Sequence, residues 1–127
     1  MAVKFLSSGW ADELKRRLNE DPAVAAALGD ASVTIQQTIA TNDGPVEYWL
    51  SVAGGAVDLG IGSVEAPDAT IVQDYATAVG LAKREVNAVT AFMIGRIKVH
   101  GNVGTLMGLQ PALGLLSEHM LAMDIEY

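Results

Sequence analysis

The chain contains no cysteine, and this absence excludes several kinds of chemistry at once. Without thiols there is no disulfide framework, no thiol nucleophile and no thiolate metal site. Histidine is scarce as well: His100 and His119 stand on different expected elements and lack the HxxxH spacing of a zinc-binding helix. We therefore expect no bound metal and no cofactor, and we expect both histidines on solvent-facing surfaces.

Long hydrophobic runs are also missing. No run reaches the roughly 20 apolar residues that a membrane-spanning helix needs, because Gln110 and Pro111 interrupt the longest candidate. The first residues lack the sustained apolar stretch of a secretory signal, so the sequence predicts a cytoplasmic protein. Residues 18–82 hold nine acids and no Lys or Arg, and the whole chain carries a net charge of −7. We expect no nucleic-acid partner, because such a surface repels phosphates.

One segment reverses this charge. Lys83, Arg84, Arg96 and Lys98 oppose only Glu85 between residues 83 and 101, so four cations and one acid leave a local net charge of +3. A charge run of this kind ordinarily forms a solvated face. The alternative is transient contact with an anionic membrane surface, where each nearby cation contributes about 1 kcal/mol.

Length and composition predict one ordered domain over residues 1–127. Half of the residues are hydrophobic and only 18% are charged, which disfavours disorder. The mean hydropathy of +0.29 is high for a water-soluble domain. The surplus of apolar side chains either forms a tight core or lines a cavity, and composition does not distinguish the two.

Periodicity predicts both helices and strands. Apolar side chains recur every second residue in three consecutive segments and every third or fourth residue in others. The expected order is a helix capped by Ser8 and ending near Pro22, strands over 31–41, 46–52, 57–61 and 69–73, helices capped by Asp74 and Asn87, a strand over 97–99, and a helical region after Asn102 that breaks at Pro111. The tail from Asp124 to Tyr127 lacks periodicity and is expected to be loosely held.

Motifs for catalysis are absent from the sequence. No GxSxG elbow surrounds any serine, and Gly60-Ile61-Gly62 lacks the third glycine of a dinucleotide site. We therefore predict no catalytic residue and no enzymatic activity. Adaptable apolar surface is abundant instead: four of the five methionines fall between residues 93 and 123. Five apolar residues share one helical stripe there, which fits either a packed core or a pliable pocket: Leu106, Leu109, Leu113, Leu116 and Met120.

One continuous segment carries a family resemblance. Ala91-Phe92-Met93-Ile94-Gly95-Arg96-Ile97-Lys98-Val99-His100-Gly101 follows Pro67-Asp68-Ala69-Thr70 and precedes Leu106-Met107. These motifs, in this order, resemble the sterol carrier protein 2 family over roughly residues 10 to 122. The resemblance implies an α+β fold: a five-stranded, mostly antiparallel sheet covered by helices, with an internal apolar tunnel for a fatty acid, fatty acyl-CoA, sterol or phospholipid.

The resemblance also nominates residues for the tunnel. By position in the motifs, the wall is expected to contain Phe92, Met93, Ile97, Val103, Leu106 and Met107, and a terminal helix lid is expected to contain Leu113, Leu116 and Met120. Trp49 and Leu50 are weaker candidates, because alternation places them on opposite faces of their strand. This chain departs from the family at Arg84, where a glycine is common.

Three functions remain open at this point. The first is non-enzymatic binding, with transfer or sequestration of one long apolar ligand, by a monomer or weak dimer. The second is a small isomerase or hydratase that keeps a buried acid protonated and uses Tyr48 or Tyr75 as a donor. The third is an interaction module whose apolar groove receives a partner helix.

Overall fold

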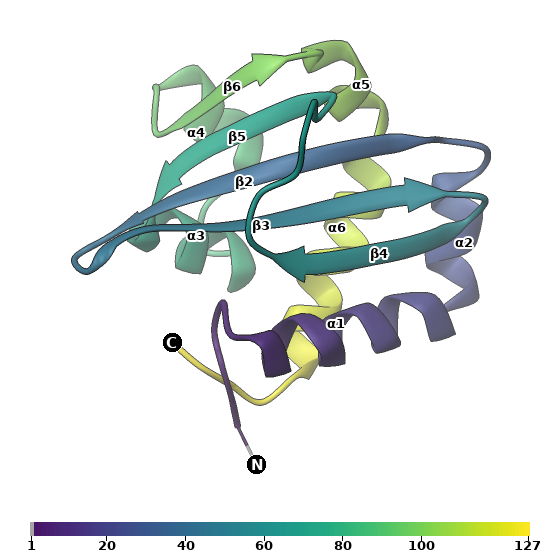
Figure 1. Ribbon diagram of the computed structural model, residues 1–127, viewed down its shortest axis with the longest axis horizontal. Helices are drawn as coiled ribbons and strands as arrows, with labels where there is room; N and C mark the ends of the chain where they lie inside the picture. Colours follow the sequence, from purple (N-terminus) through teal and green to yellow (C-terminus); the bar gives the residue numbers. More distant parts are fainter. Residues whose placement is uncertain (1) are drawn as a thin grey trace.

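The computed structural model describes residues 2–127, and a five-stranded sheet forms its centre (Figure 1). The strands lie side by side in the order β4-β3-β2-β5-β6. β2 and β5 are parallel, whereas every other neighbouring pair in this sheet is antiparallel, which confirms the mostly antiparallel prediction. The strand bounds are β2 (Val33–Thr41), β3 (Gly44–Ala53), β4 (Ala56–Ile61), β5 (Ala69–Asp74) and β6 (Ile97–Gly101).

Helices pack on one face of this sheet and along its edges, so the predicted α+β class is confirmed. α1 runs beside β4, α6 lies behind the sheet, and α4 and α5 flank the two ends of β6 (Figure 1). None of the helices in the described part of the chain is long and apolar enough to cross a bilayer. The helix bounds are α1 (Ser8–Glu20), α2 (Pro22–Leu28), α3 (Tyr75–Ala82), α4 (Ala88–Met93), α5 (Val103–Gly108) and α6 (Gln110–Ala122).

Side-chain alternation decides which face of the sheet the helices cover. Val33, Ile35 and Ile39 on β2 are buried beneath the helices, as their spacing of two predicts. On β3 the same face carries Leu50 and Val52, also buried. The core therefore lies between the sheet and the helices rather than on both sides of the sheet.

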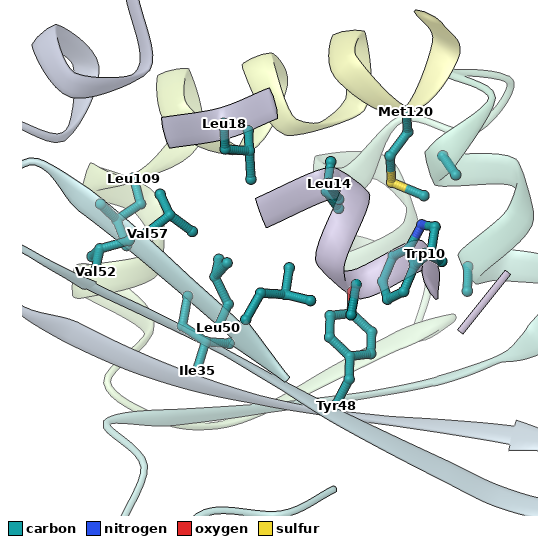
Figure 2. Close-up of a cluster of buried hydrophobic side chains, with 14 of the residues drawn as sticks. Trp10, Leu14, Leu18, Ile35, Tyr48, Leu50, Val52, Val57, Leu109 and Met120 are labelled. Carbon is teal, nitrogen blue, oxygen red and sulfur yellow. The ribbon is translucent and has the colours of Figure 1, made fainter. Parts of the chain in front are cut away.

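α1 contributes the most deeply buried side chains of this core (Figure 2). Trp10 and Leu14 are completely buried, and the Trp10 ring meets the Tyr48 ring edge-on with 5.2 Å between the ring centres. Asn19 at the end of α1 protects the edge of β4: its amide donates to the Val57 carbonyl and accepts from the Val57 amide, both at 2.8 Å. α1 therefore packs against the inner face and closes one sheet edge.

Between β4 and β5 the chain runs across the face of the sheet that the helices do not cover (Figure 1). Gln36 holds this crossover from the outer side of β2. Its side-chain nitrogen donates to the Gly62 carbonyl at 3.2 Å, and its side-chain oxygen accepts from the Val64 amide at 2.9 Å. Asp68 ends the crossover by accepting from the Thr34 amide at 2.8 Å. These bonds bring β5 beside β2 in parallel register.

Short polar side chains begin most helices. Asp74, Asn87 and Asn102 accept from backbone amides three residues later, so these three predicted caps are confirmed. The prediction of Ser8 as the first cap is wrong. The Ser7 hydroxyl accepts from the Trp10 amide instead, and Ser8 is already helical.

The C-terminal tail is held in place, so the prediction of a loose end is wrong. β7 (Ile125–Glu126) pairs in parallel with β1 (Val3–Lys4), and the rings of Tyr127 and Phe5 lie 5.0 Å apart. Two strands of two residues each are too short to produce a readable alternation. Their stability comes from partners at the other end of the chain, which periodicity does not reveal.

Gly101 occupies a site that only glycine fits. Its φ is +97°, and an added Cβ would stand 2.5 Å from the Asp68 carbonyl oxygen. We expect Gly101→Ala to lower the free energy of unfolding by about 2 kcal/mol or more, because strain and a backbone clash combine. Gly108→Ala is the control, since nothing lies within 4 Å of its Cβ position. Equal urea midpoints for the two variants would contradict this account.

Candidate functional site

An apolar cavity lies between the inner face of the sheet and the helices α1, α2 and α6. Its volume is about 20 Å³, which is the scale of a single water molecule. Every lining side chain is a hydrocarbon, so the space offers no hydrogen bond to a trapped water. The lining residues are Leu18, Val24, Leu28, Leu50, Val52, Val57, Leu109, Ala112, Leu113 and Leu116. Figure 2 labels Leu18, Leu50, Val52, Val57 and Leu109 among them.

α6 forms the looser wall of the cavity. The helix starts afresh at Gln110, with Pro111 in its first turn, so the predicted break is confirmed. Leu109 precedes it and is buried, whereas Leu113 and Leu116 are only partly buried. By contrast, Leu18 on the α1 side is buried to 3% exposure. The apolar stripe of α6 therefore faces the cavity without being tightly packed.

The structure distributes the nine nominated residues over three environments. Leu113 and Leu116 line the cavity. Ile97, Leu106 and Met120 are buried in the core outside the cavity lining. The remaining four are exposed to 38–78%: Phe92, Met93, Val103 and Met107. Their part in ligand binding stays a prediction.

The two weaker candidates separate as alternation requires. Leu50 lines the cavity from the inner face of β3. Trp49 lies on the outer face, where its ring covers Gly60 so closely that a Cβ on Gly60 would stand 2.7 Å away. Sequence reasoning missed the contributions of α1, α2 and β4 to the lining. The four-residue spacing of Val24 and Leu28 in a short helix was the available signal.

A polar contact joins α6 to the junction of α1 and α2. His119 Nε2 lies 2.8 Å from Asp21 Oδ2, across 98 residues of sequence, so the prediction of a solvent-facing His119 is corrected. Asp21 also begins α2 by accepting from the Ala23 amide at 2.9 Å. The hydrogen bond with His119 lowers the pKa of the Asp21 carboxyl below its usual value, with a smaller effect from the Ala23 amide. This contact ties α6 to the start of α2.

The four cations between residues 83 and 98 have different neighbours. Lys83 lies over the Tyr127 ring, 5.0 Å from its centre, and Arg84 pairs with Glu118 at 3.5 Å. Lys83 and Arg84 therefore face the C-terminal segment, whereas Arg96 and Lys98 lie at β6. This separation is not visible in the sequence, where the four residues read as one group.

Buried acidic groups, which the isomerase hypothesis requires, are absent from residues 2–127. The buried polar side chains in this part of the chain are those of Gln36, Gln73 and Thr77. Tyr48 is buried, and desolvation raises the pKa of its hydroxyl well above the usual value, so it stays neutral. The same residues also contain no group of three or more His, Asp or Glu side chains placed to hold a metal ion.

Comparison with known proteins identifies relatives of this fold. Sterol carrier protein 2 superposes with a TM-score of 0.79 at 20% identity, covering 94% of this chain and 98% of that one. A Thermus thermophilus protein described as possibly a sterol carrier protein gives 0.79 at 20% identity, covering 96% and 91%.

A sec-alkylsulfatase from a Pseudomonas species gives a TM-score of 0.56 at 19% identity, covering 94% of this chain but 16% of the larger enzyme. A comparison with curated protein sequences finds no significant match. The profile of the SCP-2 sterol transfer family matches residues 11–114. The chain therefore belongs to the SCP-2 sterol transfer family.

Proposed function

We propose that the protein binds one long apolar ligand, such as a fatty acid, fatty acyl-CoA, sterol or phospholipid, and transfers or sequesters it without chemical conversion. The observation that carries this proposal is the hydrocarbon-lined cavity between the sheet and α6. Membership of the SCP-2 sterol transfer family supports it independently. Burial of the ligand would supply about 25 cal/mol for each Å² of apolar surface removed from water.

Ligand entry requires α6 to move. The cavity of about 20 Å³ is far smaller than the roughly 300 Å³ or more that bound ligands occupy. The break before Pro111 lets α6 swing without unwinding α5, and only its inner stripe must leave the sheet. Leu113 and Leu116 then contact the ligand first. Ile97, Leu106 and Met120 are buried outside the present lining, and we expect them to contribute to the wall as the space widens.

The other hypotheses receive less support. An isomerase of the predicted kind lacks its buried acid, as described above. The fold of this chain also occurs as 16% of a sec-alkylsulfatase, so the domain can accompany an enzyme in a longer protein. Cytoplasmic location and a monomeric or weakly dimeric state stay predictions.

Native mass spectrometry of protein purified without detergent tests the proposed function directly. We expect an adduct of lipid mass at about one per chain, and organic extraction then identifies its class. Protein stripped of lipid should regain the adduct on incubation with fatty acids or sterols. A clean mass of the bare chain both before and after incubation would refute ligand binding.

The absence of cysteine allows the movement of α6 to be tested cleanly. In the double variant Asp21→Cys/His119→Cys, a short thiol-reactive crosslinker would tie α6 to the α1–α2 junction. We expect the crosslinked protein to take up a fluorescent fatty acid at least about tenfold more slowly, because opening is blocked. The same variant without crosslinker is the matched control. Equal uptake rates would show that α6 is not the lid.

The Asp21–His119 contact predicts a pH dependence. Because the pKa of Asp21 is lowered in the folded state, its stabilising effect is present above the usual carboxyl value near 3.8 and is lost as pH falls further. Asp21→Asn keeps a residue able to cap α2 but removes the charge. We expect this variant to melt below wild type at pH 6 and the difference to shrink below about pH 4.

Asp30→Asn is the control for this pH series, because Asp30 is exposed and outside the contact. Its melting temperature should follow wild type throughout. The groups facing the contact from neighbouring turns are Arg16, Arg17 and Glu20, which are present in both variants. A constant difference between Asp21→Asn and wild type from pH 6 to pH 3 would argue against a charge-dependent contact.

A further inference from the structure

Six apolar side chains stand in solvent at the β6 edge of the sheet. Their exposed fractions run from 38% to 78%, and they lie on, or directly after, the two helices that flank the ends of β6 (Figure 1). A single exposed apolar residue is ordinary, but six on adjoining elements mark an interaction surface. We name this set the α4–α5 surface: Val89, Phe92, Met93, Ile94, Val103 and Met107.

The two helices are too short to hide these side chains. α4 has six residues and buries only Ala91, and α5 has six residues and buries only Leu106. Met93 ends α4, and Ile94 follows it just before Gly95, whose φ of +82° turns the chain back into β6. Each helix therefore presents apolar side chains on faces that no other element covers.

The segment that carries these side chains differs in charge from the rest of the chain. Residues 86–117 contain Arg96 and Lys98 but no acidic residue. The remaining residues hold six of the eight cations and all fifteen acids, so their net charge is −9 while this segment carries +2. Arg96 immediately precedes β6 and Lys98 lies within it, so both stand on the strand segment that joins α4 to α5. Arg96 also acts electrostatically on the carboxyl of Asp74.

We propose that the α4–α5 surface docks the protein on a lipid bilayer that carries anionic headgroups. The apolar side chains enter the boundary between headgroups and acyl chains, and Arg96 and Lys98 meet the phosphates. The acidic remainder is repelled by the same headgroups, which orients the molecule with this surface inward. A protein partner would need an anionic patch flanked by two apolar patches. An anionic bilayer offers negative headgroups and apolar acyl chains at every point.

Docking in this orientation brings the lid close to the bilayer. α5 carries Val103 and Met107 into the contact, and its next residue, Leu109, lines the cavity and precedes α6. Ligand released by an opening of α6 would therefore leave beside acyl chains rather than into bulk water. This role in ligand release rests on the proposed function, but the docking itself does not require a bound ligand.

Vesicle co-sedimentation of the full chain tests the proposal. We expect wild type to bind phosphatidylcholine vesicles containing 30 mol% phosphatidylglycerol at low salt and to bind pure phosphatidylcholine much less. Val89→Asp/Ile94→Asp should reduce binding to the anionic vesicles at least about tenfold, because both side chains are exposed and would carry charge into the bilayer. Arg96→Gln/Lys98→Gln should reduce binding about thirtyfold, or about fivefold for each cation.

Matched controls come from other faces of the molecule. Leu121→Asp introduces a charge at a 52% exposed apolar residue of α6, and Lys4→Gln/Lys15→Gln removes two cations elsewhere. Both should bind anionic vesicles like wild type, and circular dichroism should show all variants folded. Vesicle binding by Val89→Asp/Ile94→Asp equal to that of wild type, or no vesicle binding by wild type, would overturn the proposal. Self-association lost in that variant, without vesicle binding, would instead identify a protein interface.

The lipid content of the same variant separates the two proposals. Val89→Asp/Ile94→Asp should still carry lipid in native mass spectrometry, because neither residue lines the cavity or was nominated for the tunnel wall. A variant that binds lipid but not vesicles supports docking through this surface. Failure of wild type to hold any lipid, with vesicle binding intact, would overturn the proposed function and leave the docking surface standing.

Discussion

The packing of helices onto a single face of the sheet is the constraint on which this structure depends. The inner face of β2 and β3 is apolar, and it must be covered for the sheet to be stable in water. α1 covers its part tightly, with Trp10 and Leu14 fully buried, whereas α6 leaves Leu113 and Leu116 partly exposed around a cavity. α1 therefore meets this requirement with tight packing, whereas α6 meets it with looser packing beside the cavity.

Local patterns in the sequence predicted most of the fold. Alternation identified the strands, short polar side chains identified three helix caps, and Pro111 marked the break before α6. Each of these signals acts within a few residues, so it is readable along the chain. Contacts between distant segments left no such signal. The pairing of β1 with β7 and the contact of His119 with Asp21 join opposite ends of the sequence, and both were missed.

The candidate site was predicted in part for the same reason. The 3,4 spacing of the last helical region placed Leu113 and Leu116 on one stripe, and both line the cavity. Phe92 and Met107 belong to motifs typical of the family, but family position does not specify how deeply a side chain is buried. Each lies on a six-residue helix that buries one other side chain, so both point into solvent. Burial depends on what packs against a helix, which the sequence of that helix does not contain.

The α4–α5 surface and the loosely packed α6 are linked by the free energy of opening α6. Opening α6 in water would expose Leu109, Leu113 and Leu116 at roughly 25 cal/mol for each Å² of apolar area, which favours the closed state. Beside acyl chains the same side chains would find an apolar environment, so that penalty would largely disappear. A bilayer docked at the α4–α5 surface would therefore favour opening where ligand can be exchanged, and the acidic remainder would return the closed protein to water.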